Sequence, residues 1–166
     1  ASRLEALGAH ATFVDLADYP MPLYDGDLEQ AQGVPTNARH LRDLLADHSG
    51  LLLVSPEYNG FITPLMKNTL DWLSRPDEHY GGLELFRGRI AAMLSASPGG
   101  LGGLRSLMML RQLLGNLGVT VLPDQLAVAQ APKAFAEDGQ LAEPDQQTRL
   151  DAICARLDDS VQRLRA

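Results

Sequence analysis

Short apolar runs alternate with stretches of helical periodicity along most of this chain. An apolar run bounded by turn residues is typical of a strand that is buried on both faces of a sheet. We expect such strands at residues 51–54, 90–94 and 119–122, with residues 126–130 extending the same edge, and another short strand at residues 11–16. Apolar positions three or four residues apart predict helices over residues 36–47, 64–73, 104–117 and from residue 144 onward, after the end of a helix at residues 1–7. This alternation predicts an α/β fold with a parallel sheet.

Capping residues predict where two of these helices start. Thr63 is a favoured N-cap residue, and Pro64 suits the first helical position, where no N–H is needed. Either Thr36 or Asn37 is expected to cap the earlier helix. Residues 17–35 form a long polar connection before it, and a connection of this length is uncommon unless it is functional or packed by its own side chains.

Composition limits the size of the fold and its partners. A chain of 166 residues is expected to form one domain with a sizeable core. It includes 14 basic and 21 acidic side chains, which give a net charge of −7. No basic stripe is visible, so neither nucleic acid nor an anionic membrane surface is an expected partner. The one cysteine, Cys154, excludes an internal disulfide and suits a reducing compartment. Because no apolar run approaches membrane-spanning length and no signal-peptide pattern is seen, we expect a cytoplasmic location.

A polar loop, residues 56–60, follows the apolar run at residues 51–54. Tyr58 offers a flat face and a hydroxyl, Asn59 offers a donor and an acceptor, and Gly60 permits a close approach of the backbone. In open α/β sheets, ligands bind in the crevice outside the carboxyl ends of the strands. The loop is therefore a candidate site for a planar polar ligand, although a plain βα turn with a helix cap has the same composition.

A second candidate loop, residues 95–103, lies between the strand at 90–94 and the next helix, with the sequence SASPGGLGG. Its four glycines let the backbone lie close to a flat ligand, and Ser95 and Ser97 add hydroxyl groups. The loop N–H groups and the helix N-terminus favour carbonyl oxygens or negative charge. The loop lacks the Lys-Ser/Thr ending of an NTPase P-loop, which disfavours ATP hydrolysis.

Other catalytic arrangements are not supported by residue spacing. No GxSxG pattern surrounds any serine, which argues against a serine hydrolase. No metal ligands are expected, because the histidines are scattered along the chain. They are His10, His40, His48 and His79.

The segment SPEYNG at residues 55–60, followed by PLMKNTLDWLSRP at residues 64–76, resembles the NADPH-dependent FMN reductases. This flavodoxin-like family includes quinone, azo-dye and chromate reductases. Met66 stands where the family usually has leucine, a volume-conserving exchange. The resemblance implies a flavodoxin-like three-layer α/β/α sandwich with a parallel sheet of strand order 2-1-3-4-5.

The resemblance also implies FMN as cofactor and NADPH or NADH as co-substrate. Hydride would pass from the reduced nicotinamide to the flavin, which would then reduce a small-molecule acceptor such as a quinone, an azo or nitro compound, a free flavin or a metal oxyanion. No catalytic side chain is required, because the cofactor carries the chemistry. The residues that the resemblance assigns to FMN binding are Pro56, Glu57, Tyr58, Asn59, Gly60, Ser95, Ser97, Pro98, Gly99, Gly100 and Gly103.

The start of the chain departs from the family pattern. Residues 11–16 correspond to the second strand of the family, and nothing before them corresponds to its first strand or its glycine-serine-arginine phosphate loop. We therefore expect residues 1–166 to be one flavodoxin-like FMN-binding domain that is truncated at its N-terminus. A chain that lacks the phosphate loop and a central strand is expected to bind FMN poorly, fold poorly, or both.

Two further expectations concern alternatives and assembly. A non-catalytic flavodoxin-like electron carrier or binding module remains the alternative to a reductase. Glu57 has the chemistry of a general base, but the resemblance implies a structural or interfacial role for it.

A homodimer or homotetramer is implied by the family, and residues 72–86 hold apolar side chains that a lone domain would leave partly exposed, unless they fold onto their own core. Arg105 and Arg111 are expected at a surface or an interface.

Overall fold

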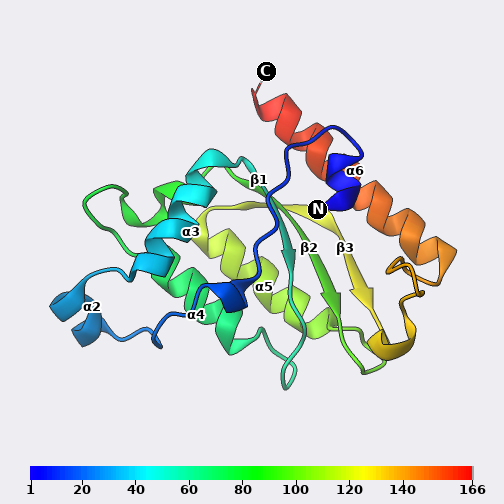
Figure 1. The fold of residues 1–166 in the computed structure, drawn as a ribbon, viewed down its shortest axis with the longest axis horizontal. Helices are drawn as coiled ribbons and strands as arrows, with labels where there is room; N and C mark the ends of the chain where they lie inside the picture. The colour runs from blue at the N-terminus through cyan, green and yellow to red at the C-terminus, as the bar shows by residue number, and fades with distance from the viewer. Residues whose placement is uncertain (166) are drawn as a thin grey trace.

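A computed structural model describes residues 1–165 and shows a parallel sheet between two layers of helices (Figure 1). The strands are β1 Gly50–Val54, β2 Ile90–Ala96 and β3 Thr120–Val128. The α-helices are α1 Ser2–Glu5, α2 Gly26–Gln32, α3 Thr36–Asp47, α4 Pro64–Leu73, α5 Leu104–Leu117 and α6 Pro144–Arg165. Short 3₁₀ turns lie at Leu16–Asp18, Gly82–Leu85 and Ala131–Lys133. The α/β class and its three layers, predicted from the sequence, are confirmed.

The sheet has the order β1-β2-β3, and both strand pairs are parallel. These strands follow one another as strands 3, 4 and 5 do in the order 2-1-3-4-5. Between the pairs Ala91–Val121 and Met93–Gln125 the register shifts, so β3 carries extra residues there, Pro123 among them. Residues 119–122 and 126–130, predicted as separate pieces, therefore belong largely to one strand. This strand is irregular because Pro123 lacks the N–H that a regular ladder needs.

Backbone carbonyl groups in the irregular part of β3 accept hydrogen bonds from a side chain of α5. The Arg111 guanidinium donates to the carbonyl oxygens of Leu122 at 2.8 Å and Pro123 at 3.3 Å, and to Oε1 of Gln125 at 2.9 Å. Carbonyl groups that the register shift removes from the ladder thus have a charged donor. The prediction of a surface or interface position for Arg111 missed this role within the fold.

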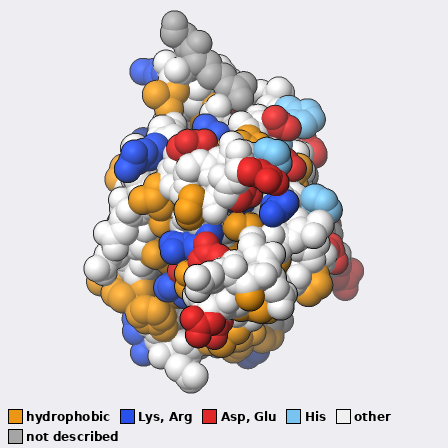
Figure 2. All heavy atoms as spheres, turned by 90° about the vertical axis from the view of Figure 1, so that its left-hand side faces the viewer, with side chains coloured by type: hydrophobic (Ala, Val, Ile, Leu, Met, Phe, Trp, Pro, Cys, Tyr) orange, Lys and Arg blue, Asp and Glu red, His pale blue; other side chains and the backbone are white. Residues whose placement is uncertain are grey.

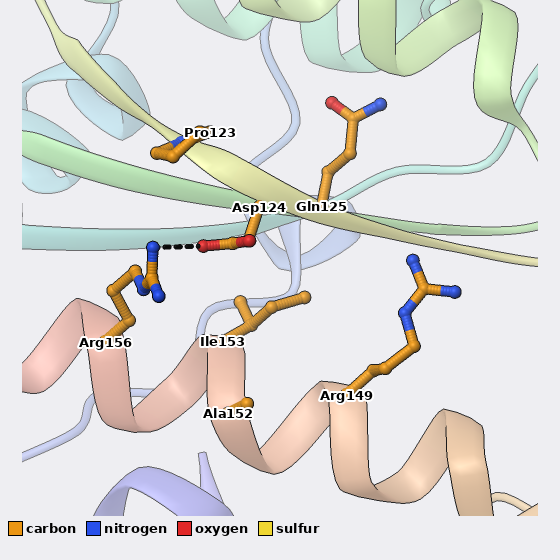
Figure 3. Close-up of a pocket in the computed structure, with 7 residues that line it drawn as sticks. All are labelled: Pro123, Asp124, Gln125, Arg149, Ala152, Ile153 and Arg156. Carbon is orange, nitrogen blue, oxygen red and sulfur yellow. Dashed lines mark ion pairs between the residues drawn. The ribbon is translucent and has the colours of Figure 1, made fainter.

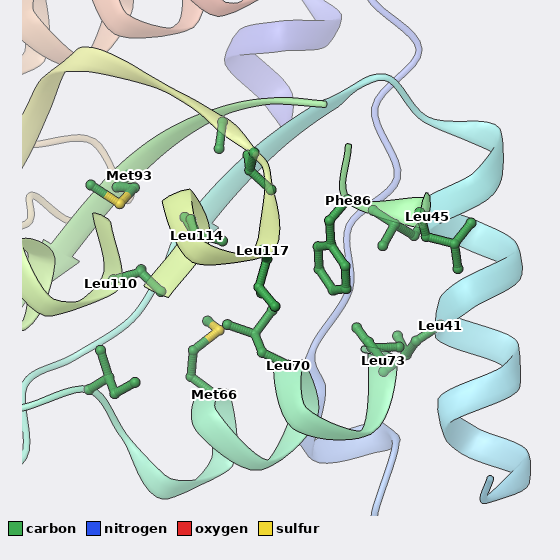
Figure 4. Close-up of a cluster of buried hydrophobic side chains, with 14 of the residues drawn as sticks. Leu41, Leu45, Met66, Leu70, Leu73, Phe86, Met93, Leu110, Leu114 and Leu117 are labelled. Carbon is green, nitrogen blue, oxygen red and sulfur yellow. The ribbon is translucent and has the colours of Figure 1, made fainter. Parts of the chain in front are cut away.

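Alternate residues of β2 serve the two cores. Ala91 and Met93 face the layer formed by α3, α4 and α5, whereas Ile90 and Ala92 face α6, and all four are at most 6% exposed. Figure 4 shows side chains of α3, α4 and α5 converging on the first of these cores. The period-two alternation of a strand therefore decides which helix layer each residue contacts.

Helix α6 covers the other face of the sheet (Figure 1). It buries Ile153, Cys154 and Leu157, each at most 4% exposed. Burial raises the pKa of the Cys154 thiol above its ordinary value. No helix in the described part of the chain combines the length and the apolar character needed to cross a membrane.

One of the two predicted helix caps is present. Thr63 is the N-cap of α4 and accepts a hydrogen bond from the Met66 N–H at 3.2 Å, with a proline in the first turn, as predicted. Helix α3 starts at Thr36 with no side-chain cap, so the predicted cap by Thr36 or Asn37 is wrong. The Asn37 amide instead donates to the Pro20 carbonyl at 2.8 Å, which fastens the preceding segment to the helix.

The strand predicted at residues 11–16 is absent from the described structure, and this prediction is wrong. Val14 and Leu16 pack against the core formed by α3, α4 and α5, but the segment forms no ladder with β1. A strand requires a hydrogen-bonded neighbour along its length, and an apolar run by itself supplies only the packing face.

The long connection at residues 17–35 is packed by its own contacts. It includes helix α2, which was not predicted; Asp25 caps this helix by accepting from the Asp27 and Leu28 N–H groups. The Pro22 carbonyl accepts hydrogen bonds from Trp72 Nε1 at 2.8 Å and from Asn68 Nδ2 at 2.9 Å. These contacts hold the connection against α4.

Residues 72–86 turn onto their own core. Trp72 is fully buried and Phe86 is 1% exposed, so the exposed apolar surface expected here is not present. The loop after α4 is tied to α3 by Arg42, a fully buried side chain that donates to Asp77 at 2.6 Å and to the Tyr80 carbonyl at 3.1 Å. Figure 2 shows basic and acidic side chains interspersed with apolar ones on the face of the molecule that lies to the left in Figure 1.

Substitution of Asp77 by Ala is expected to lower the free energy of unfolding by about 3–5 kcal/mol, because it leaves the buried Arg42 charge without its carboxylate. Burial raises the pKa of Asp77, but the N–H groups of His79 and Tyr80 and the arginine charges outweigh it, so the pKa lies below its ordinary value. This contribution is present above the ordinary pKa and is lost as the pH falls through the lowered one. Denaturant unfolding at neutral and acidic pH measures both effects.

The matched control is Glu78→Ala, because Glu78 is exposed and pairs with Arg39 and His79 only at the surface. Its effect on unfolding is expected to stay within about 0.5 kcal/mol. Equal effects of the two substitutions would show that the buried pair contributes nothing special.

Candidate functional site

Two loops meet at the carboxyl ends of β1 and β2. Because the strands are parallel, both ends lie at the same edge of the sheet, and the Ser55 N–H donates to the Leu94 carbonyl at 3.1 Å. We call residues 55–61 the turn loop and residues 97–103 the glycine loop. All the residues that the sequence assigned to the cofactor, apart from Ser95 at the end of β2, lie in these two loops, as the crevice rule predicts.

The tip of the turn loop is a tight hairpin turn. Tyr58 and Phe61 exchange backbone hydrogen bonds of 3.1 and 3.0 Å, and Asn59 and Gly60 between them have φ values of 52° and 79°. Positive φ at both central residues is the geometry of a type I′ turn, for which Asn-Gly is a preferred sequence. The Asn-Gly sequence of this loop is therefore a local signal for the turn. The turn leaves the side chains of Tyr58 and Asn59 exposed, with Pro56 exposed at the base of the loop.

Glu57 joins the turn loop to helix α5. Its side chain is 7% exposed and accepts hydrogen bonds from Nε of Arg105 at 2.8 Å, from the terminal guanidinium nitrogen of Arg105, and from the Ser106 N–H at 3.3 Å. The hydrogen bonds from Arg105 lower the pKa of Glu57 below its ordinary value, against the opposite effect of desolvation. The partnership was not predicted, because 48 residues separate the two side chains.

Two glycines of the glycine loop are required by packing. Gly103 has φ of 92°, and a Cβ at this position would lie 1.8 Å from Oγ of Ser95. Gly102 has φ of 60°, and its Cβ would lie 2.6 Å from the Ala129 nitrogen. Ser95 itself is 1% exposed, so the structure places it beneath the loop and not on the loop surface.

The outer part of the glycine loop faces open space. Pro98, Gly99 and Gly100 are exposed, and a Cβ at Gly100 would meet nothing within 4 Å. Ser97 anchors this part, because its N–H donates to the Val128 carbonyl at 3.1 Å and its carbonyl accepts from the Ala131 N–H at 3.0 Å. The result is a stretch of exposed backbone at Gly99 and Gly100 without side chains, which leaves room for the flat edge of a flavin ring.

A cavity elsewhere in the molecule shares no residue with the two loops. It measures about 360 Å³ and opens between the irregular part of β3 and helix α6 (Figure 3). Arg156 pairs there with Asp124 at 2.9 Å across the pocket, beside Ile153 and Arg149. Within residues 1–165, no group of three or more His, Cys, Asp or Glu side chains is arranged to hold a metal ion. The candidate site therefore consists of the two loops.

A family model described as NADPH-dependent FMN reductase matches residues 1–133 of the chain. An NAD(P)H-dependent FMN reductase of Pseudomonas aeruginosa is 36% identical over 130 residues, which cover 77% of this chain and 67% of that protein. A quinone reductase of Escherichia coli is 35% identical over 103 residues, which cover 61% of this chain and 52% of that protein. These matches thus span only about half to two thirds of the relatives' own length.

A solved structure shows the same fold. The flavoenzyme FerB, an NAD(P)H:(acceptor) oxidoreductase from Paracoccus denitrificans, superposes with a TM-score of 0.78 at 25% identity, and the match covers 97% of this chain and 86% of that one. The fold of this solved structure and the family model point to the same family. The chain belongs to the NADPH-dependent FMN reductase family.

Proposed function

We propose that this protein is an NAD(P)H-dependent oxidoreductase that binds FMN between the turn loop and the glycine loop. The observation that supports this most directly is the backbone surface at Gly99 and Gly100, free of side chains and on the same edge of the sheet as the exposed Tyr58–Asn59 turn, in a chain of this family. Bound FMN would accept hydride from a reduced nicotinamide and deliver electrons to a small-molecule acceptor of the quinone, azo, nitro, flavin or metal-oxyanion class.

The protein's own residues supply binding and orientation. The glycine loop would lie along the flavin ring, with Ser97 and Pro98 fixing its position, while Tyr58 and Asn59 would provide a flat face and hydrogen-bonding groups. Ser95 and Gly103 would support the loop from beneath. Access to the ring follows from the open geometry of the loops, and no acid–base pair is needed.

The setting of the reaction is part of the same proposal. Residues 1–166 would act as one FMN-binding domain in the cytoplasm, without nucleic acid or membrane as partner. A homodimer or homotetramer is supported by an exposed apolar strip beside the site, in which Leu101, Leu104 and Met108 are 51%, 41% and 57% exposed. Contiguous exposed apolar surface of this kind is typical of an interface.

Because a chain without the family's phosphate loop is expected to bind FMN weakly, the test uses a longer chain that carries an upstream strand and a glycine-serine-arginine loop. Incubation of this chain with FMN followed by gel filtration is expected to give a yellow protein whose flavin absorbance is bleached anaerobically by NADPH or NADH. Addition of a quinone should restore the colour, because the acceptor reoxidises the flavin. A yellow protein that neither nucleotide bleaches would indicate an electron carrier. A protein that stays colourless would indicate a binding module and contradict the reductase.

Substitution of Asn59 by Gly is expected to weaken FMN binding by about 1–3 kcal/mol while leaving the melting temperature close to that of the wild type. Glycine keeps the positive φ of the turn and removes only the carboxamide. Asn59→Ala, in contrast, also strains the turn, so the pair separates a ligand contact from turn geometry. Fluorescence titration measures both affinities; an unchanged affinity of the Gly variant would remove the Asn59 side chain from the site.

Two glycine substitutions separate ligand contact from packing. Gly100→Ala is expected to keep the melting temperature and to lower FMN affinity, because the added methyl group enters only the open surface. Gly103→Ala is expected to destabilise the fold by more than 1 kcal/mol, because the methyl group collides with Ser95 at a positive φ. Thermal melting and FMN titration of both variants test this, and full FMN affinity in Gly100→Ala would mean that the glycine loop is only a turn.

A further inference from the structure

The carboxylate of Glu57 occupies the start of helix α5. It accepts a hydrogen bond from the Ser106 N–H in the first turn of this 14-residue helix, in addition to those from the Arg105 guanidinium. A helix N-terminus carries unpaired N–H groups and partial positive charge, which makes it a binding place for anions. In this protein an internal anion already fills that place.

The same carboxylate also supports the turn loop through Arg105. A Cβ at Gly60 would lie 3.5 Å from the central guanidinium carbon of Arg105, so this group lies directly behind the turn. Glu57 belongs to the turn loop, and Arg105 and Ser106 belong to the helix that follows the glycine loop. One side chain, 7% exposed, thus connects the two halves of the proposed site.

The general-base role for Glu57 does not fit this environment. Its oxygens are directed at Arg105 and Ser106, and the hydrogen bonds from Arg105 favour the ionised form. A general base must reach the proton that it removes. The geometry therefore gives Glu57 a structural role, as the acceptor of hydrogen bonds from Arg105 and Ser106.

We propose that Glu57 is a positioning and specificity-determining residue. By filling the anion place at the start of α5, its carboxylate keeps phosphate out of the glycine loop and reserves the loop for an uncharged ring edge. By holding Arg105 behind the Asn59–Gly60 turn, it also fixes the distance between the turn loop and the glycine loop. This inference rests on the proposed function for the identity of the ring, but the exclusion of phosphate is independent of it.

The test compares the wild type with Glu57→Ala and Glu57→Gln. Asp71→Asn is the matched control, because it removes one carboxylate from the exposed Lys67–Asp71 pair on α4, away from both loops. The first measurement is the melting temperature as inorganic phosphate replaces chloride at constant ionic strength. The second is the affinity for riboflavin, which carries the flavin ring without a phosphate.

Glu57→Ala is expected to gain a saturable, phosphate-dependent rise in melting temperature, because Arg105 and the helix N–H groups become available to an external anion. The wild type and Asp71→Asn are expected to show no such rise. Riboflavin affinity should fall about tenfold or more in Glu57→Ala, and stay at the wild-type value in Asp71→Asn. A loss of structure alone would not create a new response to phosphate.

Several results would overturn the proposal. One is a Glu57→Ala protein with no response to phosphate. Another is a Glu57→Ala protein with unchanged riboflavin affinity, provided that the wild type binds riboflavin. If Glu57→Ala does not fold, the riboflavin affinity of Glu57→Gln decides in its place, since glutamine keeps the side-chain shape and removes the charge that holds Arg105. An unchanged affinity of this variant would overturn the proposal. If the wild type binds neither FMN nor riboflavin, the proposed function fails, while the phosphate measurement still decides the role of Glu57 at α5.

Discussion

The burial of β2 on both faces is the constraint on which the rest of this structure depends. Every side chain from Ile90 to Met93 is at most 6% exposed, so each face of the strand must be covered by a helix layer. Parallel strands covered in this way are joined by crossover helices, which bring the carboxyl ends of the strands to one edge of the sheet. The turn loop and the glycine loop are neighbours for this reason, and any ligand between them contacts segments that are far apart in the chain.

Within that edge, the glycines divide into two groups with different physical roles. Gly102 and Gly103 allow the loop to press against β3 and Ser95, where a side chain would collide. Gly99 and Gly100 have free space in front of them. The first group lets the backbone pack closely against β3 and Ser95, and the second leaves it accessible, so the accessible surface is held against the core behind it. Such preorganisation lowers the entropic cost of ligand binding.

Features that depend on nearby residues could be predicted from the sequence, and features that depend on distant partners could not. Helix α5 at Leu104–Leu117 has the predicted bounds, because its apolar stripe is continuous and a glycine lies at each end. The apolar run at residues 11–16 resembled a strand, but no spacing within it reveals whether a hydrogen-bonded neighbour exists. Glu57 and Arg105 pair across 48 residues without any local pattern. The turn at residues 59–60, by contrast, has the Asn-Gly sequence that is typical of a type I′ hairpin turn, so its geometry depends on nearby residues alone.

The position of Cys154 has a practical consequence for studying how this protein moves. The thiol is 2% exposed and lies near the amino terminus of the chain and Arg3, which pairs with Asp151 of α6, and burial raises its pKa. Alkylating reagents attack the thiolate, so the cysteine reacts only during moments when the contact between the start of the chain and α6 opens. As the one cysteine of the chain, it reports on this contact: the alkylation rate measures how often the contact opens, without any added label or substitution.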